Sequence, residues 1–451
     1  MPPSGDTIAA IATAPGMAAI GVVRVSGPEA YAVADRLFRP RRGPPPSRRP
    51  AGRVLLGRVV DTRETGAEEV VDEALLLTFR APNSYTGQDL VEVQTHGGPA
   101  VLRKVLDLCL AAGARPAGPG EYTLRAFLSG RIDLAQAESV QAMVEAQTDG
   151  ARRNAATGLF STLGSSLGAI QTEVTKAYAA LQASLDYPDE GVPDTELEEP
   201  LRRALARVEA LLATAEAGRI SRHGARLALV GMPNAGKSSL LNALLGFERS
   251  IVGPTPGTTR DYLEAPLSLG GVPLTAIDTA GIRRAADSVE ASGVALARRI
   301  ADSADLCVIL LDRSVPLDRE ALALLEALPP QRALAVASKA DLPAAWAESV
   351  LTPAPLPVSA FDGRGLEELK DAVRHRLLGS AEGAELWITS ERQAHALETA
   401  RRHLRAALGA ADDVASLELQ DALDALARVT GRGNIPEETL ASIFANFCVG
   451  K

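Results

Sequence analysis

The stretch from Gly231 to Ser238 combines residue types and spacing that suit phosphate binding. It reads Gly-Met-Pro-Asn-Ala-Gly-Lys-Ser, which fits the pattern GxxxxGK[ST] of a loop between a strand and a helix. Glycines let the backbone pass close to phosphate oxygens, so that successive N–H groups donate to them. Lys237 would add positive charge beside the β and γ phosphates, and the Ser238 hydroxyl can ligate Mg²⁺. A nucleoside triphosphate site is therefore predicted, and a fortuitous glycine-rich turn is the disfavoured alternative.

Two further segments have residues that can sense a γ phosphate. Gly257–Asp261 carries Thr259, whose hydroxyl can complete the Mg²⁺ shell when the loop orders around a triphosphate. Asp278–Gly281 follows an apolar stretch, where the aspartate can reach Mg²⁺ through water and the glycine N–H can contact the γ phosphate. Either segment alone reads equally well as a polar turn.

The segments at Ser338–Asp341 and Ser359–Ala360 suggest that the base is guanine. The Asp341 carboxylate can accept two parallel N–H donors that guanine presents and adenine does not. A backbone N–H at Ser359–Ala360 could meet the guanine carbonyl. Each segment is weak alone, but all of them follow predicted strands in order, and ligands of doubly wound sheets lie at those strand ends.

These loops require a sheet that brings the strand ends together. Five near-continuously apolar stretches predict buried parallel strands, at residues 226–230, 274–277, 306–312, 333–338 and 356–359. The helix after the phosphate loop is expected over 238–245. Alternating strands and helices favour a doubly wound α/β domain with helices on both faces.

The flanking segments have other patterns. Residues 7–114 predict a small α+β domain, with strands at 20–25, 74–79 and 90–93 and a helix at 99–112. Apolar residues recur at helical spacing after Tyr122 and again after Leu378, and an acidic, proline-rich connection is predicted at 186–200. The α/β domain is therefore expected to be inserted into a helical domain. The predicted domains are 1–120, 121–222 with 378–451, and 223–377.

Composition excludes several classes of protein. The chain has 451 residues with 47 Lys and Arg against 56 Asp and Glu, a net charge of −9, which argues against disorder and against a general nucleic-acid coat. The Arg- and Pro-rich stretch at 39–53 is a solvated loop insertion or, less readily, a local basic patch. The three cysteines form no CxxC pair, the five histidines form no cluster, and no signal peptide or membrane span is visible. A soluble, cytoplasmic protein is expected.

Stretches along the whole chain resemble one known family. They are 21–27 (GVVRVSG), 81–87 (APNSYTG), 94–99 (QTHGGP), 120–127 (GEYTLRAF), 133–138 (DLAQAE) and the terminal 447–451 (FCVGK). With Gly231–Phe361, which resembles a GTPase domain related to translation factors, they resemble the MnmE (TrmE) family of tRNA modification GTPases. This resemblance implies an N-terminal α+β folate-binding and dimerisation domain, an all-α helical domain and a Ras-like G domain inserted into it.

The resemblance implies a GTP and Mg²⁺ site built from the loops described above. The nucleotide-binding residues would be Asn234, Ala235, Gly236, Lys237, Ser238, Ser239, Gly253, Pro254, Thr255, Pro256, Gly257, Thr258, Thr259, Asp278, Thr279, Ala280, Gly281, Ser338, Lys339, Asp341, Ser359 and Ala360. Ser238 and Thr259 would ligate Mg²⁺. Ser338 stands where the family has asparagine, so a lower affinity for GTP is expected.

The family lacks the water-positioning glutamine of Ras-like proteins, and Ile282 follows Gly281 here. Glu290 falls on the family's catalytic glutamate, where a carboxylate can polarise a bridging water, although a solvated helix charge is the rival interpretation. Lys237 and Asn234 would be the other catalytic residues.

By the same resemblance, K⁺ replaces an arginine finger. Its ligands would be Asn234, Gly253, Thr255 and Thr258. The segment Gly253-Pro254-Thr255-Pro256 departs from the family's Thr-Asp-Ile-Ala, so an altered potassium dependence is expected.

The N-terminal domain would bind 5,10-methylene- or 5-formyl-tetrahydrofolate. Arg24, Glu92, Arg131 and Lys451 fall on the family's folate-binding positions. An exposed strand residue remains the rival interpretation of Glu92. Cys448 either lies near the folate or is a buried structural thiol.

The function implied is that of a homodimeric GTPase. With an FAD- and NADH-dependent partner resembling MnmG, in a heterotetramer, it would add an aminomethyl or carboxymethylaminomethyl group to C5 of the tRNA wobble uridine. The alternative is a regulatory GTPase in ribosome assembly with no carbon transfer, for which Arg24, Glu92 and Lys451 would be dispensable. A module that binds only folate is a third and weaker hypothesis, because it leaves the phosphate loop unexplained.

Overall fold

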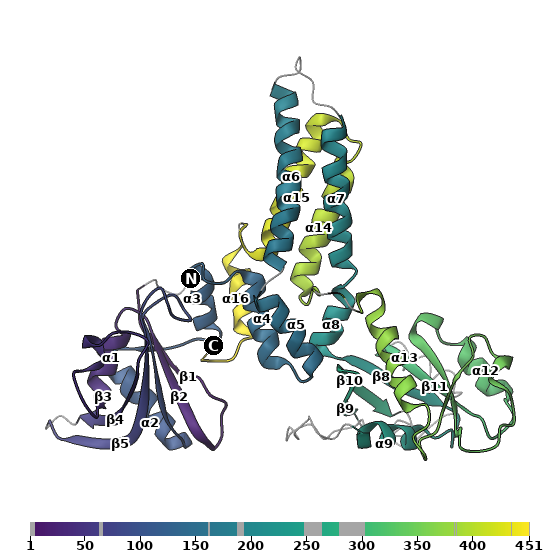
Figure 1. The fold of residues 1–451 in the computed structure, drawn as a ribbon, viewed down its shortest axis with the longest axis horizontal. Helices are drawn as coiled ribbons and strands as arrows, with labels where there is room; N and C mark the ends of the chain where they lie inside the picture. The colour runs from purple at the N-terminus through teal and green to yellow at the C-terminus, as the bar shows by residue number, and fades with distance from the viewer. Residues whose placement is uncertain are drawn as a thin grey trace. The chain divides into compact units, whose positions relative to one another are not determined.

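The computed structural model describes residues 5–62, 66–160, 163–186, 194–247, 264–278, 303–382, 384, 386–433 and 435–450. The chain forms two compact units, Met1–Gln141 with Thr430–Lys451, and Ala142–Val429 (Figure 1). The multidomain class predicted above, α+β, all-α and doubly wound α/β, is confirmed. The three domain boundaries stay a prediction, because the second unit joins the α/β segment to helices of the predicted helical domain.

The first unit is built on a seven-stranded sheet in the order β3-β4-β5-β6-β2-β1-β7. Its strands are β1 (Ile8–Ile11), β2 (Ala18–Ser26), β3 (Phe38–Pro40), β4 (Val54–Thr62), β5 (Glu68–Phe79), β6 (Leu90–Gly97) and β7 (Arg115–Pro116). The three predicted strands form the parts of β2, β5 and β6 that are richest in apolar residues. The strands β1, β3 and β7 escape a search by pattern because they are only two to four residues long.

Helices α1 (Ala30–Leu37) and α2 (Pro99–Ala111) cover one face of this sheet. Val33, Leu102 and Val105 pack with Val23 and Val91 of the strands in one buried cluster. Alternation of apolar and polar residues places every second side chain of a strand in this core. The opposite face carries exposed apolar side chains, among them Ile20, Val54 and Leu56.

The C-terminus returns to the first unit. Helix α16 (Glu437–Ala445) packs against α3 (Glu121–Leu128) and the start of α4 (Leu134–Glu145) through Leu134, Leu440 and Phe444. Beyond α16, Gly450 has a φ of +99°, and a Cβ there would lie only 2.4 Å from the Ile11 carbonyl oxygen. Only glycine fits at this approach to β1.

The second unit contains a six-stranded sheet in the order β13-β12-β11-β8-β10-β9. Its strands are β8 (Ala225–Gly231), β9 (Glu264–Leu269), β10 (Val272–Asp278), β11 (Leu306–Asp312), β12 (Ala333–Ser338) and β13 (Leu356–Val358). All five predicted strands are present and parallel. The unpredicted β9 pairs with β10 antiparallel, through a two-glycine turn at Gly270–Gly271.

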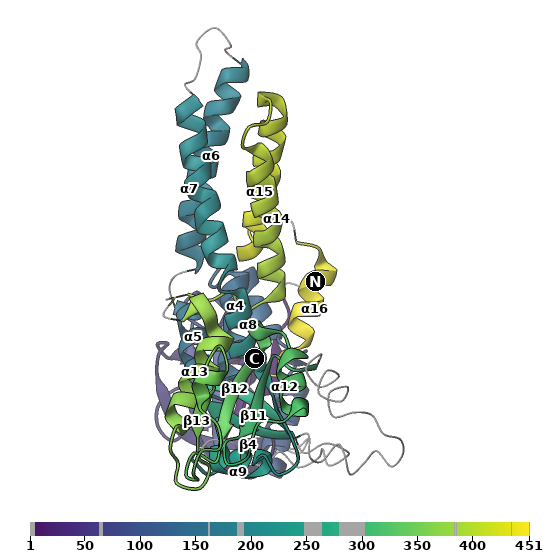
Figure 2. The same cartoon turned by 90° about the vertical axis from the view of Figure 1, so that its right-hand side faces the viewer.

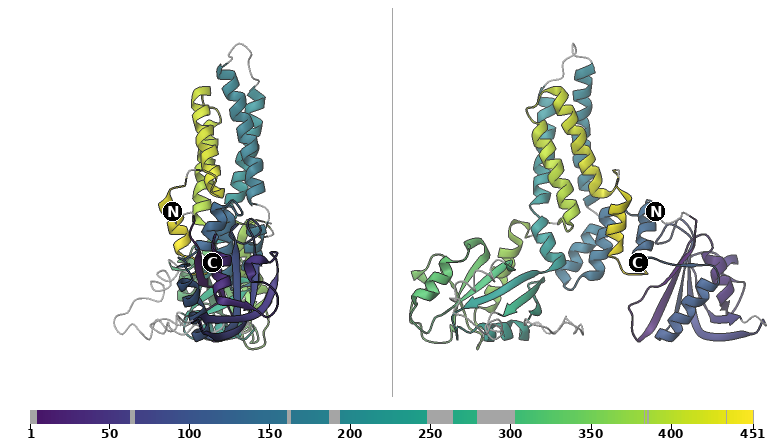
Figure 3. Two further views of the ribbon diagram at one scale, coloured as in Figure 1. Left: turned by 90° about the vertical axis from the view of Figure 1, so that its left-hand side faces the viewer. Right: turned by 180° about the vertical axis from the view of Figure 1, so that it is seen from behind.

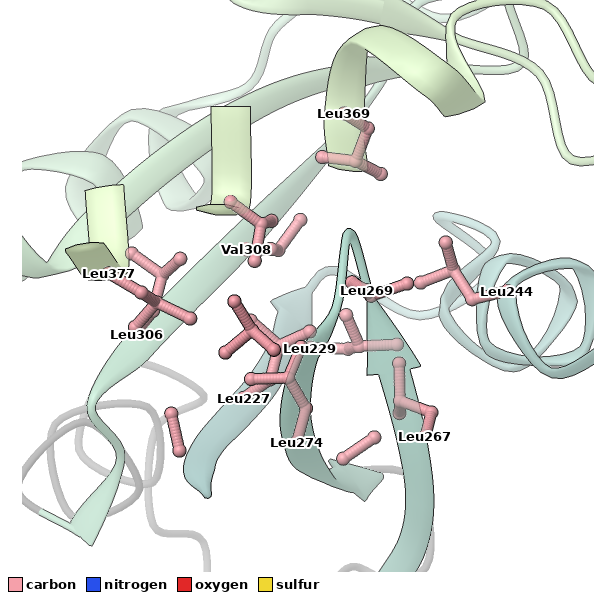
Figure 4. Packing of buried hydrophobic residues seen from close by; sticks show 14 of the residues in the cluster. Leu227, Leu229, Leu244, Leu267, Leu269, Leu274, Leu306, Val308, Leu369 and Leu377 are labelled. Atoms are coloured by element: carbon pink, nitrogen blue, oxygen red, sulfur yellow. The ribbon is translucent and has the colours of Figure 1, made fainter. Parts of the chain in front are cut away.

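Both faces of this sheet are buried. Leu227 and Leu229 of β8 pack on the side of α9 (Lys237–Phe247) and α13 (Leu366–Leu378), as Figure 4 shows. The alternate residues Ala228 and Val230 pack on the side of α12 (Arg319–Glu326). Burial of both faces explains why the strands are apolar without alternation, as in parallel sheets generally.

Long helices make up the rest of the second unit. They are α5 (Asp149–Phe160), α6 (Leu163–Asp186), α7 (Asp194–Leu212), α8 (Ala215–His223), α14 (Glu391–Ala407) and α15 (Asp412–Thr430). Helices α6, α7, α14 and α15 lie side by side as a bundle (Figure 2 and Figure 3). Short 3₁₀ turns occur at Pro46–Arg48, Pro330–Arg332, Glu348–Val350 and Gly379–Ala381.

One prediction about the bundle is wrong. The connection expected over 186–200 is shorter, because α7 begins at Asp194 and includes Pro200. A proline inside a helix costs about 3 kcal/mol in propensity. The face of α7 formed by Leu201, Ala204 and Val208 is buried in the bundle, and this packing outweighs that cost.

Candidate functional site

The phosphate loop joins the carboxyl end of β8 to the start of α9. Asn234 has a φ of +63° and Gly236 one of +93°, so the chain turns through left-handed conformations that asparagine and glycine tolerate best. A Cβ on Gly231 would lie 2.6 Å from the Leu310 carbonyl oxygen on the neighbouring strand. These positions explain why the loop needs its glycines.

The Lys237 ammonium group lies over the loop that precedes it. Its Nζ donates to the carbonyl oxygens of Gly231 at 2.9 Å and Met232 at 2.8 Å. Ala235 is buried, whereas Asn234, Ser238 and Ser239 are exposed. The loop therefore presents a cation, a hydroxyl and an amide side chain at one edge of the sheet, which is a donor set that suits a triphosphate and its metal ions.

Ser338, the last residue of β12, connects the phosphate loop to β11. Its Oγ is within hydrogen-bond distance of the Ala235 carbonyl oxygen, at 2.8 Å, and of the Leu311 carbonyl oxygen, at 3.2 Å. The residue is only 6% exposed. The serine that departs from the family's asparagine thus makes a buried link between the phosphate loop and the base-reading loop, a role that its residue type alone did not indicate.

Lys339 follows with a φ of +58°, and its Nζ forms an ion pair with Asp312 Oδ2 at 2.6 Å. Burial alone would raise the pKa of the Asp312 carboxyl, but hydrogen bonds from Lys339 and Ser314 outweigh it and lower that pKa. Asp312 therefore holds Lys339 at the carboxyl end of β11. Asp312 was not predicted as a site residue, although its place at the end of a predicted strand was a usable signal.

The Asp341 carboxylate is oriented by the segment after β13. Ser359 Oγ donates to Asp341 Oδ1 at 2.7 Å and accepts from the backbone N–H groups of Phe361 and Asp362, each at 3.2 Å. Ser359 is fully buried, while Asp341 is exposed. Within the part of the chain that the structure describes, Asp341 Oδ2 has no hydrogen-bond partner, so it is available to a base. Ala360, half-buried, follows Ser359 as predicted.

Several predicted residues lie outside the described residues. They are Gly253, Pro254, Thr255, Pro256, Gly257, Thr258, Thr259, Thr279, Ala280, Gly281, Glu290 and Lys451. For Asp278 the backbone position is given, as the last residue of β10 and opposite Leu229 of β8. The loops that were predicted to contact the γ phosphate are therefore untested by the geometry.

A second cluster of polar residues lies in the first unit, around Arg24. Arg24 on β2 and Glu92 on β6 are direct cross-strand partners, and Arg24 Nη2 lies 2.7 Å from Glu92 Oε1. Their side chains are 19% and 17% exposed. Glu92 is therefore paired and half-buried, which contradicts its interpretation as an exposed strand residue.

Two tyrosines and the C-terminal backbone complete this cluster. The Arg24 guanidinium carbon lies 5.3 Å from the centre of the Tyr85 ring and 5.5 Å from that of Tyr122, and Arg24 Nη1 donates to the Gly450 carbonyl oxygen at 3.3 Å. Burial raises the pKa of both tyrosine hydroxyls. Tyr85 and Tyr122 were not predicted as site residues, although both lie in stretches that carry the family resemblance.

Arg131 and Cys448 lie at the margin of this cluster. Arg131 donates to the carbonyl oxygen of Ser84, next to Tyr85 in sequence. Cys448 is exposed and not in a disulfide, so its interpretation as a buried structural thiol is wrong. The chemistry of the cluster, a guanidinium, a carboxylate and aromatic rings, suits an anionic ligand with a planar heterocycle.

Among the residues described, no three His, Cys, Asp or Glu side chains are grouped so as to hold a metal ion. The helices found there also include none with the length and apolar character that crossing a bilayer requires.

A phosphate loop and a guanine-reading loop, joined at the carboxyl edge of a doubly wound sheet, define the G domain of a GTP-binding protein. Comparison with known proteins specifies the family. The model of the GTP-binding protein TrmE N-terminus matches residues 7–131, and that of the MnmE helical domain matches residues 134–448. The chain therefore belongs to the MnmE family of tRNA modification GTPases.

Full-length relatives support this assignment. The tRNA modification GTPase MnmE of Thermus thermophilus is 53% identical over 446 residues, which cover 99% of each chain. The proteins of the same name from Roseiflexus sp. and Moorella thermoacetica are 43% and 41% identical, again over 99% of each chain.

Proposed function

We propose that this protein hydrolyses GTP to drive modification of tRNA. The observation that carries the proposal is the buried Ser338 link, which places the phosphate loop beside the loop of Asp341. The carboxylate of Asp341, oriented by Ser359, reads the N–H edge of guanine while Lys237 and the loop N–H groups bind the phosphates.

Metal ions would assist at the phosphates. The exposed Ser238 hydroxyl in the first turn of α9 fits a Mg²⁺ ligand, with Thr259 as the second. Asn234, exposed in its left-handed conformation, fits a K⁺ ligand beside oxygens of Gly253, Thr255 and Thr258. K⁺ would neutralise charge that develops between the β and γ phosphates, and Glu290 would polarise the bridging water.

The first unit is proposed to bind the one-carbon folate. Glu92 can accept N–H donors of a pterin with Arg24 beside it, Tyr85 can pack against the pterin ring, and Arg131 and Lys451 can pair with the glutamate tail. The folate would supply a carbon for C5 of the wobble uridine, as an aminomethyl or carboxymethylaminomethyl group.

The homodimer is proposed to form through the open face of the first sheet. Ile20 and Arg24 point to the same face of β2, and exposed Leu56 and Leu75 are cross-strand partners on β4 and β5. A second copy would cover these apolar side chains next to the Arg24–Glu92 pair. The MnmG-like partner, the heterotetramer and a cytoplasmic location belong to the same proposal.

The test is GTP hydrolysis by the purified protein in KCl and in NaCl, with Asp341→Asn assayed on GTP and on XTP. We expect faster hydrolysis in KCl, and a variant that loses GTP but gains XTP, because asparagine pairs with the carbonyl that XTP presents. Hydrolysis of GTP by Asp341→Asn at the wild-type rate would contradict guanine reading by Asp341. Equal rates in both salts would exclude the K⁺ role of Asn234 and leave the GTPase intact.

A further inference from the structure

Positive charge is concentrated in one short segment of this acidic protein. Between Phe38 and Val60 the sequence contains seven arginines and no aspartate or glutamate, whereas the whole chain has a net charge of −9. The segment comprises β3, the proline-rich loop with its 3₁₀ turn and the first part of β4. A segment with this much positive charge is either exposed only to solvent or binds a negatively charged ligand.

Five of the seven arginines make no side-chain hydrogen bond or ion pair with the residues that the structure describes. Arg41, Arg42, Arg48, Arg53 and Arg58 are exposed, and their guanidinium groups make no ion pair or hydrogen bond within the described residues. We call these five the arginine edge. The other two are structural, since Arg39 pairs with Glu68 at 2.6 Å and Arg49 bonds to the carbonyl oxygens of Pro44 and Arg42.

The loop that carries four of these five arginines is anchored to the rest of the first unit. Ser47 is hydrogen-bonded through its backbone N–H, at 3.0 Å, and its hydroxyl to Asp35 of α1. Arg80 donates to the Ser47 carbonyl oxygen at 3.0 Å and lies 3.6 Å from the centre of the Tyr31 ring. The Arg41 N–H bonds to the Leu56 carbonyl oxygen at 2.9 Å. A loop fixed in this way loses little conformational entropy when it binds a ligand.

Arg41, Arg42, Arg48 and Arg53 lie on the loop between β3 and β4, and Arg58 lies on β4, between Arg39 of β3 and Glu73 of β5. β3 is the terminal strand in the sheet order, and Arg39 of β3 is the cross-strand partner of Arg58. Charged residues on an edge strand also prevent unwanted strand pairing, which is the rival explanation. Edge protection, however, does not require four further exposed arginines on the loop that follows the edge strand.

We infer that the arginine edge binds the phosphodiester backbone of RNA. This inference rests on the proposed function, whose substrate is a tRNA. Guanidinium groups pair with phosphate in two parallel hydrogen bonds, and exposed arginines without acidic partners need not break an ion pair first. Binding of this kind is independent of sequence and falls steeply with salt, because each neutralised phosphate releases counterions.

The experiment measures the affinity of the full-length protein for an unmodified tRNA transcript across a series of KCl concentrations. The variant Arg41→Gln/Arg42→Gln/Arg48→Gln removes three charges without touching any side-chain hydrogen bond. We expect its affinity to fall on the order of tenfold or more, and its slope of log affinity against log salt to decrease by about 2 to 3.

The control variant Arg152→Gln/Arg202→Gln/Arg203→Gln changes the net charge equally. These exposed arginines on α5 and α7 are paired with Asp149, Glu198 and Glu199 on their own helices, so we expect the wild-type slope. A salt slope unchanged in the first variant, or equally reduced in the control, would overturn the inference.

Two other results would also overturn it. If the first variant self-associates in sedimentation velocity while its affinity for tRNA is unchanged, the arginines protect a sheet edge. If the wild-type protein does not bind tRNA, the surface has another partner, such as an acidic protein. Failure of the proposed GTPase is seen separately, because hydrolysis is measured without RNA.

Discussion

Ser338 is a buried residue between the two nucleotide-binding loops. Its buried hydroxyl bonds to the Ala235 carbonyl oxygen and so joins the loops that contact the phosphates and the base. In Ser338→Ala that oxygen loses its partner, which costs about 1 to 1.5 kcal/mol. We expect roughly five- to tenfold weaker binding of a fluorescent GDP analogue in an equilibrium titration.

Two variants serve as comparisons. Ser338→Thr keeps a hydroxyl and is expected to retain more affinity than Ser338→Ala. Ser268→Ala changes a half-buried serine on β9, whose hydroxyl makes no hydrogen bond within the described part of the chain, and should bind as the wild type does. Unchanged affinity in Ser338→Ala would show that the link does not matter for binding.

At the scale of elements, the phosphate loop depends on the close approach of β8 and β11. Gly231→Ala would place a methyl group 2.6 Å from the Leu310 carbonyl oxygen, so the strands must separate. Overpacking of this kind costs about 1 to 3 kcal/mol. We expect a lower free energy of unfolding in urea denaturation, together with weaker nucleotide binding.

Gly246→Ala in the adjoining helix α9 is the matched control. A Cβ there meets nothing within 4 Å, and alanine is the better helix former by up to about 1 kcal/mol. This variant should be as stable as the wild type or slightly more so. Equal stability of the two variants would contradict the strand-approach argument.

At the scale of the whole molecule, the first unit should lose stability in acid. In the first unit, buried Arg125 and half-buried Arg115 form ion pairs with Asp6 and Glu121 at 2.6 to 2.9 Å. Burial would raise the pKa of both carboxyls, but hydrogen bonds from Arg115 and Arg125 outweigh it and lower the two pKa values. Their contribution to stability is therefore complete above the ordinary carboxyl pKa values and is lost as the pH falls through the lowered ones.

Urea unfolding at neutral and acid pH tests this. Both tryptophans of the chain, Trp346 and Trp387, lie in the second unit, so their fluorescence reports that unit, while far-ultraviolet circular dichroism reports both. Glu121→Gln should lower the stability of the first unit by about 3 to 5 kcal/mol at neutral pH and reduce its acid dependence. If Glu121→Gln shifted only the unfolding transition seen by tryptophan fluorescence, the ion pairs of Glu121 would not be what stabilises the first unit.

Much of the fold could be predicted because buried strands and helices have recognisable patterns of apolar residues. Strands buried on both faces, such as Leu306–Asp312, are apolar almost throughout, and the phosphate loop has an unmistakable spacing. The short edge strand Phe38–Pro40 and the helix through Pro200 were not predictable, because distant neighbours stabilise them against their local propensities.

The sequence by itself determined the chemical types that the protein brings to bear: a lysine and serine after a glycine loop, a base-reading aspartate, and an arginine and glutamate far apart in the chain. Only the tertiary structure decided which of them meet. The register of β2 and β6 pairs Arg24 with Glu92, and the return of the C-terminus adds Gly450 to them. The parallel sheet likewise brings Ser338 to Ala235, 103 positions earlier in the chain. Such contacts depend on the register between strands and on where distant segments of the chain meet. The pattern of residues within a short stretch of sequence does not encode either.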